Sequence, residues 1–373
     1  MKRKQIIIIA ALVVSSFILV VLITYEPNIK RPQEPQKPYP YYTEDVTFQN
    51  KSAGVNLAGT LTLPSTEGPF PVVILISGSG AQNRNEQISG HKPFLIIADH
   101  LTRIGIAVLR YDDRGVGKST GNFKEATTVD FASDVASAVA YLKARKEINK
   151  YKIGLIGHSE GGIVAPMVAS SSEDVAFIVL LAGPGIELRK VLMKQQELIP
   201  RAMGASEAEI QKSTEINEKA FEMISTSHDR NALKASLAKL IEENFDDIPA
   251  KLRPPNMTKE QVMAMQSESL SSPWFQNLLN YNPGLTLSKI TCPVLALNGE
   301  KDIQVTPKEN LTGIRDALMN AGNANVSVKE LPGLNHLFQN CETGSLTEYG
   351  TIEETFSPMA LEIMSEWILN QVK

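Results

Sequence analysis

Strand-like runs alternate with helix-like runs along most of this chain, and that alternation limits the possible folds more than any other feature. Residues 71–76 form a solid, mostly β-branched run, which is typical of a strand buried on both faces. Farther on, Phe131, Val135, Val139 and Leu142 recur at helical spacing and form one apolar stripe. This alternation predicts an α/β fold, in which a mainly parallel sheet carries helices on both faces. Strands are expected at 45–48, 55–63, 71–76, 106–109, 152–156, 175–181, 293–297 and 326–331, and helices at 93–104, 131–142, 161–169, 307–320 and 358–369.

The alternation stops at 186–288, where no buried-strand run occurs. This segment is rich in Met, Glu, Lys and Ala and predicts several helices, with breaks near Pro200 and Pro273. It is too long for a simple loop between two core strands. We therefore expect an inserted helical cap at the carboxyl edge of the sheet, where α/β active sites lie. The core would then consist of 42–185 and 289–373.

The first 25 residues hold the most apolar stretch of the sequence. Three basic residues at 2–4 precede an uncharged run over 6–24, and a helix over this run would be about 28 Å long, which is close to the hydrocarbon core of a bilayer. No Ala-x-Ala cleavage pattern follows the run. The run predicts one transmembrane helix, a signal anchor over 1–25, which would bind the bilayer through 6–24. The anchor would place the folded part of a cell-membrane protein outside the cytoplasm; the alternative is secretion after signal cleavage.

A proline-rich segment follows at 26–41. It contains five prolines, so it can form neither a helix nor a strand ladder. We expect an extended spacer between the bilayer and a folded part that begins near Tyr42.

Composition excludes several classes of protein. The chain has 37 basic and 41 acidic side chains and no long basic block, which argues against a nucleic-acid-binding protein. Its two cysteines, Cys292 and Cys341, exclude a disulfide scaffold, although one disulfide between them is conceivable outside the cell. The Gly-Lys-Ser sequence at 117–119 lacks the first glycine of a phosphate-binding loop, because Asp112 stands there. No cluster has metal-ligand spacing, so we expect neither a metal nor a cofactor.

The sharpest chemical signal is the sequence Gly-His-Ser-Glu-Gly at 157–161. It lies directly between an expected strand and an expected helix. In this context G-x-S-x-G forms a tight turn that exposes the serine side chain at the edge of the sheet. The glycines are needed because a Cβ there would collide with neighbouring backbone. Ser159 is therefore the expected nucleophile, and an ordinary glycine-rich turn is the alternative.

A serine nucleophile needs a base, and the chain has five histidines. His336 follows the last expected strand, 326–331, in a loop at the carboxyl edge of the sheet, which makes it the best candidate. His158 lies inside the turn and is expected to point elsewhere. The base needs a carboxylate to fix its tautomer. Asp302 follows the expected strand 293–297 and gives the order Ser, Asp, His along the chain, with Glu300 as the competing carboxylate.

Catalysis of acyl transfer also needs two N–H donors for the oxyanion. One is expected from Glu160, the residue after the nucleophile, at the positive end of a helix. The other is expected from the loop at 77–80, which reads Ser-Gly-Ser-Gly. Its small residues allow the backbone to approach a substrate, so we assign the Ser79 N–H; a merely flexible loop is the alternative.

Together these motifs resemble the α/β-hydrolase superfamily, most of all the bacterial serine esterases and serine aminopeptidase-like hydrolases with a helical cap. The resemblance covers 45–371 and implies that Ser159 is the nucleophile, Asp302 the acid and His336 the base of a carboxylic-ester hydrolase. One departure is that many members have His-Gly at the oxyanion loop, where this chain has Ser-Gly at 77–78. The matching segments are SGSGAQNRNE at 77–86, GHKPF at 90–94, LRYDDRGVGKSTG at 109–121, GHSEGG at 157–162, SPWFQNLLNYNP at 272–283, CPVLALNGEKD at 292–302 and PGLNH at 332–336.

The expected reaction is the hydrolysis of small to medium acyl esters through an acyl-enzyme. Trp274 and Phe275 are candidates for lining the substrate pocket, with core packing as the equal alternative. An aminopeptidase or a thioesterase could use the same triad, and a non-catalytic surface binding module is a further alternative. An aminopeptidase would need a cap carboxylate to bind the substrate amine, and Glu187, Glu197, Glu222, Glu242 and Glu243 are available.

Overall fold

The computed structural model describes residues 29–247 and 257–373. The predicted anchor at 1–25 and its bilayer contact at 6–24 lie outside these ranges and stay predictions. Within them, no helix combines the length and the apolar character that a membrane crossing requires.

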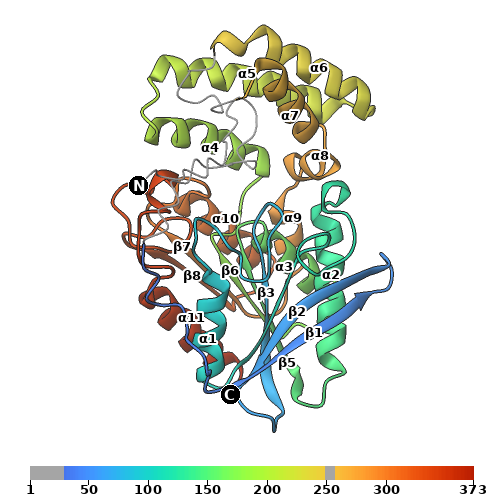
Figure 1. Ribbon diagram of the computed structural model, residues 1–373, viewed down its shortest axis with the longest axis vertical. Coiled ribbons are helices and arrows are strands. Elements are labelled where there is room, and N and C mark those ends of the chain that lie inside the picture. Colours follow the sequence, from blue (N-terminus) through green and yellow to red (C-terminus); the bar gives the residue numbers. More distant parts are fainter. Residues whose placement is uncertain (1–28, 248–256) are drawn as a thin grey trace, which may run out of the picture.

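A sheet forms the centre of the protein (Figure 1), and in the described ranges it has eight strands in the order β1-β2-β4-β3-β5-β6-β7-β8. Strands β3 to β8 are parallel, whereas β1 and β4 each pair antiparallel with β2. The prediction of a mainly parallel sheet is confirmed. The strands are β1 (Tyr42–Asn50), β2 (Val55–Leu63), β3 (Phe70–Ile76), β4 (Ala107–Tyr111), β5 (Ile148–His158), β6 (Phe177–Leu181), β7 (Val294–Gly299) and β8 (Val326–Leu331).

Helices cover both faces of this sheet, as the sequence predicts. In β3, Ile74 and Ile76 pack with α2, α3 and α10 on one face, while Val73 and Leu75 pack with α1 and α11 on the other. Burial on both faces explains why the strand is a solid apolar run. The helices are α1 (Pro93–Arg103), α2 (Thr128–Lys143), α3 (Gly161–Ala169), α10 (Pro307–Asn320) and α11 (Pro358–Gln371).

Between β6 and β7 the chain forms a separate helical layer beyond the carboxyl edge of the sheet (Figure 1). Its helices share an apolar cluster that includes Leu192, Phe221 and Leu237. A second cluster joins the layer to the sheet domain, because Ile163 of α3 packs with Leu188 of α4. The layer consists of α4 (Leu188–Ala202), α5 (Glu207–Thr226), α6 (Arg230–Glu243), α7 (Lys259–Leu270) and α8 (Pro273–Leu279). The short helix α9 (Pro283–Leu287) packs instead against α10 and α3 of the sheet domain.

The proline-rich segment is not a free spacer in its described part. Arg31 Nη1 donates a hydrogen bond to the carbonyl of Ile352 at 2.6 Å, and Gln33 Nε2 donates to that of Phe356 at 2.7 Å. Residues 31–41 contain no helix or strand, as expected. The prediction of an extended spacer is nevertheless wrong for them, because long side chains replace the backbone bonds that proline removes and fix the segment on the domain.

Candidate active site

Ser159 lies on a tight turn between β5 and α3. Its φ of +52° is in the left-handed region, which residues other than glycine rarely adopt. A Cβ on Gly157 would lie 1.9 Å from the carbonyl oxygen of Gly161, and one on Gly161 would lie 2.2 Å from that of Ile76. Close backbone contact therefore requires both glycines, and the turn places Ser159 at the carboxyl edge of the sheet.

Two further predicted residues meet at the same edge. His336 Nδ1 lies 2.7 Å from Asp302 Oδ2, and both side chains are buried. The other carboxylate oxygen, Oδ1, accepts the N–H groups of Gln304 at 2.8 Å and Val305 at 2.9 Å. Asp302 is thus held with one oxygen facing the imidazole, which places the ring proton on Nδ1 and leaves Nε2 free to act as a base.

Glu300, the competing carboxylate, has a different partner. Its Oε2 accepts a hydrogen bond from the N–H of Gly333 at 2.8 Å. Glu300 therefore stabilises the loop before His336 and makes no hydrogen bond to the imidazole. Ser159 Oγ makes no hydrogen bond with a described residue. The His336 ring lies against that of His158, next to the serine, with 4.9 Å between ring centroids.

The two backbone N–H groups expected to bind the oxyanion have no hydrogen-bond acceptor among the described residues. Among the described residues, neither the Ser79 N–H nor the Glu160 N–H donates a hydrogen bond. A Cβ on Gly78 would lie 3.2 Å from the Cβ of Ser159, so the loop at 77–80 passes directly beside the serine. The two N–H groups are therefore available to a substrate carbonyl at this edge.

A buried carboxylate, that of Glu86, lies behind this loop. Glu86 Oε1 accepts the Gly78 N–H at 2.6 Å and lies 2.9 Å from His158 Nδ1. The other ring nitrogen of His158, Nε2, lies 3.0 Å from the carbonyl oxygen of His336. His158 does point away from the serine, as predicted, but it contacts both loops of the site.

The carboxyl group of Glu160 connects the turn to the helical layer. Its Oε1 accepts hydrogen bonds from Thr128 Oγ1 at 2.7 Å and from Trp274 Nε1 at 2.8 Å. Burial raises the pKa of Glu160, and these two donors oppose that shift. Trp274 of α8 is thereby placed next to the residue that follows Ser159.

A cavity of about 500 Å³ lies beside the oxyanion loop, and Trp274 lines it together with Gly80, Phe123 and Met265. Phe275 does not line it. That side chain is fully buried in the apolar cluster of the helical layer, so the prediction that it contributes to the pocket is wrong. Successive side chains on a helix point about 100° apart, which sends these two neighbours to different surroundings.

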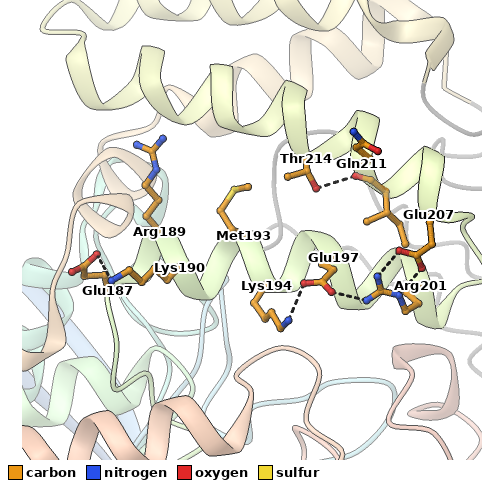
Figure 2. Close-up of a pocket in the computed structure, with 11 residues that line it drawn as sticks. Glu187, Arg189, Lys190, Met193, Lys194, Glu197, Arg201, Glu207, Gln211 and Thr214 are labelled. Atoms are coloured by element: carbon orange, nitrogen blue, oxygen red, sulfur yellow. Dashed lines mark hydrogen bonds and ion pairs between the residues drawn. The ribbon is translucent and has the colours of Figure 1, made fainter.

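A second cavity, of about 750 Å³, lies between α4 and α5 (Figure 2). Its charged side chains bind one another: Glu197 lies 2.9 Å from Lys194 and 2.8 Å from Arg201, which also lies 2.7 Å from Glu207. None of the predicted catalytic residues lines this cavity, and we do not assign it to the site.

The remaining motifs are structural. Ser119 Oγ of the Gly-Lys-Ser sequence donates to the carbonyl of Asp112 at 2.6 Å, and Arg114 forms a buried ion pair of 2.7 Å with Asp134 of α2. These contacts hold the loop after β4 against the end of β4 and against α2. The two cysteines are free thiols.

Comparisons with known proteins find similar hydrolases and similar folds. The family model described as serine aminopeptidase, S33, matches residues 91–241. Esterase EstD of Thermotoga maritima is 27% identical over 299 residues, which are 80% of this chain and 62% of EstD. These matches make the chain similar to hydrolases of the α/β-hydrolase superfamily. Among solved structures of similar fold, the esterase Pf2001 of Pyrococcus furiosus has a TM-score of 0.54 at 18% identity, over 89% of this chain and 92% of Pf2001.

Two further comparisons cover different shares of this chain. The putative hydrolase YtaP of Bacillus subtilis is 30% identical over 149 residues, 36% of this chain and 49% of YtaP. The hypothetical protein PA2218 of Pseudomonas aeruginosa has a TM-score of 0.54 at 16% identity, over 91% of this chain and 96% of PA2218. This chain thus spans less than two thirds of the length of EstD and YtaP.

Proposed function

We propose that the protein is a serine hydrolase that cleaves carboxylic esters through an acyl-enzyme. One observation carries this proposal: the turn with Ser159 and the His336–Asp302 pair, held at 2.7 Å, share the carboxyl edge of one sheet. The names of EstD and Pf2001, both esterases, support the ester as substrate.

In the proposed mechanism, Ser159 Oγ attacks the ester carbonyl carbon while His336 Nε2 takes the hydroxyl proton. Asp302 stabilises the imidazolium that forms. The N–H groups of Ser79 and Glu160 bind the oxyanion of the tetrahedral intermediate. The carbon–oxygen bond to the alcohol then breaks, and His336 returns its proton to the leaving alkoxide. Water repeats the sequence on the acyl-enzyme and releases the acid.

The cavity beside Gly80 suits an apolar acyl group of small to medium size, because Phe123, Met265 and Trp274 provide apolar walls. Ala264 of α7 also lines it and is exposed, so a larger side chain there would fill the cavity without disturbing a core. We expect Ala264→Trp to lower kcat/KM for octanoyl esters by about tenfold and to affect acetyl esters much less.

The matched control for this experiment is Ala235→Trp, which changes an exposed alanine of α6 that is not among the residues lining the cavity. It should leave the chain-length profile of p-nitrophenyl esters unchanged. Equal losses for acetyl and octanoyl esters in Ala264→Trp would contradict the assignment of this cavity to the acyl group.

The aminopeptidase alternative receives less support, although the matching family model bears that description. Among the cap carboxylates considered for binding an amine, Glu187 lies 3.2 Å from Lys190 and Glu197 is paired with Lys194 and Arg201. The two carboxylates that line the 500 Å³ cavity are also paired, because Arg230 lies 3.0 Å from Glu125 and 2.9 Å from Glu268.

A panel of ester, thioester and aminoacyl-amide substrates tests the proposal. We expect the highest kcat/KM for esters, and a preference for aminoacyl amides or thioesters would replace it by one of the alternatives. A fluorophosphonate probe separates the enzyme from a non-catalytic binding module, because only a serine activated by a base reacts with it.

We also propose that the apolar run at 6–24 anchors the protein in the cell membrane, with the catalytic domain outside the cytoplasm. The basic residues at 2–4 and the length of the run support this. Full-length protein should stay in the membrane fraction after carbonate extraction, whereas a chain of 29–373 should not. Release of the full-length chain would show cleavage or a different role for the run.

A further inference from the structure

The pair formed by His158 and Glu86 occupies the centre of the site without touching the reacting atoms. Both side chains are buried, with exposed fractions of 5% and 1%. Each ring nitrogen of His158 faces an oxygen: Nδ1 lies 2.9 Å from Glu86 Oε1, and Nε2 lies 3.0 Å from the carbonyl of His336. The same Oε1 accepts the N–H of Gly78 at 2.6 Å.

These contacts determine the position of one proton and leave a second to be placed. A backbone carbonyl oxygen can only accept, so His158 Nε2 must carry a hydrogen that it donates to His336. The contact between Nδ1 and Glu86 Oε1 needs one more hydrogen. With that hydrogen on Nδ1, His158 is an imidazolium beside a carboxylate, and the pair has no net charge that would disturb the imidazole of His336.

The electrostatic surroundings favour this arrangement. Burial opposes a charge on His158, but the carboxylate of Glu86, the carbonyl of His336 and the more distant Asp302 outweigh it, so the pKa of His158 is raised. The nearby carboxyl of Asp113 is buried as well, and burial raises its pKa to about 8. The rings of His336 and Phe338 also lie beside the imidazole.

We propose that His158 and Glu86 form a charged positioning pair that aligns the base loop and the oxyanion loop on either side of the nucleophile. His158 holds the backbone of His336, and Glu86 holds the N–H of Gly78, which precedes the Ser79 donor. Because His158 also precedes Ser159 in the chain, three parts of the site are joined through one imidazolium. This inference rests on the proposed hydrolase activity.

The Glu86→Gln variant tests the charge of the pair. The Gln oxygen must still accept from the N–H of Gly78, since an amide NH₂ there would face that N–H donor to donor. His158 must then donate from both nitrogens, which only the imidazolium can do. Without the carboxylate, the pKa of His158 falls, and one of its two contacts is lost as pH rises through that lower pKa.

We therefore expect Glu86→Gln to lower kcat by about tenfold to a hundredfold, with KM within about twofold of wild type. The alkaline limb of its kcat–pH profile should move to lower pH, because the pair is intact only while His158 is protonated. The acidic limb, which reports His336 as the base, should stay in place. A merely structural role would not move one limb alone.

Two amide variants of His158 test its two hydrogen bonds separately, because each variant can keep only one of them. An Asn amide nitrogen can replace Nδ1 and keep the bond to Glu86, whereas a Gln amide nitrogen can replace Nε2 and keep the bond to His336. Both variants should lower kcat, and combining His158→Gln with Glu86→Gln should cost no more than the worse single change. His100→Gln is the control, because the hydrogen-bond partner of His100 is Ser365 of α11, which lies outside the candidate site.

The outcomes are distinct. If the Glu86 and His158 variants keep wild-type kcat and pH profile while Ser159→Ala is inactive, the positioning pair is wrong and the hydrolase proposal stands. A loss of kcat that disappears when rates are divided by the fraction of fluorophosphonate-labelled sites would also overturn it, because the variants would then only be partly folded. Activity in Ser159→Ala would instead refute the proposed function.

Discussion

Replacing Ser159 with alanine is expected to lower kcat for ester hydrolysis by about 10⁵-fold. Without Oγ no acyl-enzyme can form, and only substrate binding and the two oxyanion donors remain to accelerate attack by water. Initial rates with p-nitrophenyl butyrate at saturating concentration measure the effect. A change of this size is expected because serine, base and carboxylate act as one unit.

The fold should tolerate this change. Alanine has the same Cβ as serine, so the backbone at φ +52° bears no additional strain. Ser159 Oγ also makes no hydrogen bond with a described residue, and its loss leaves no partner unsatisfied. We therefore expect an unchanged Tm and far-UV circular dichroism spectrum.

Labelling with a fluorophosphonate separates this result from a general loss of activity. The wild type should react with one equivalent, and the alanine variant should not react. Ser137→Ala, which changes a partly exposed serine of α2, is the control and should react like the wild type. Labelling of the Ser159→Ala protein would show that another serine is the nucleophile.

The sheet could be predicted from the sequence because its strands are buried on both faces. In β3 the side chains at 73 and 75 enter one apolar cluster and those at 74 and 76 enter the other, which produces an uninterrupted aliphatic run. The position of the proposed catalytic residues at one edge of the sheet could be predicted for a related reason. Each follows a strand of one parallel sheet, and the carboxyl ends of parallel strands meet at a single edge.

The other features of the site and the fold depend on side-chain contacts between distant parts of the chain, which the hydrophobic pattern of the sequence does not predict. Glu86 lies in an irregular loop, and only the folded chain brings it to His158. The side chains of Arg31 and Gln33 hold a segment that its prolines would otherwise leave detached. Chain order could not separate Asp302 from Glu300 either, because both follow β7 within a few residues; only the direction of each carboxylate in the loop does so.

Asp302→Asn is expected to lower kcat by about 10⁴-fold with little change in KM. The backbone N–H groups of Gln304 and Val305 both point at Oδ1, so the amide oxygen of the variant would stay there and its NH₂ would face His336. An NH₂ group donates, and Nδ1 would have to accept. The ring proton would move to Nε2, the atom that must take the proton of Ser159.

Glu300→Gln is the matched control, since it removes the competing carboxylate from the same loop. Its amide oxygen can still accept the N–H of Gly333, so kcat should change by less than about threefold. Rates of both variants with p-nitrophenyl butyrate, compared at equal fluorophosphonate-accessible enzyme, decide between the two carboxylates. A large loss in Glu300→Gln together with a small one in Asp302→Asn would assign the acid to Glu300, and would require a loop arrangement in which Glu300 leaves Gly333 to reach the imidazole.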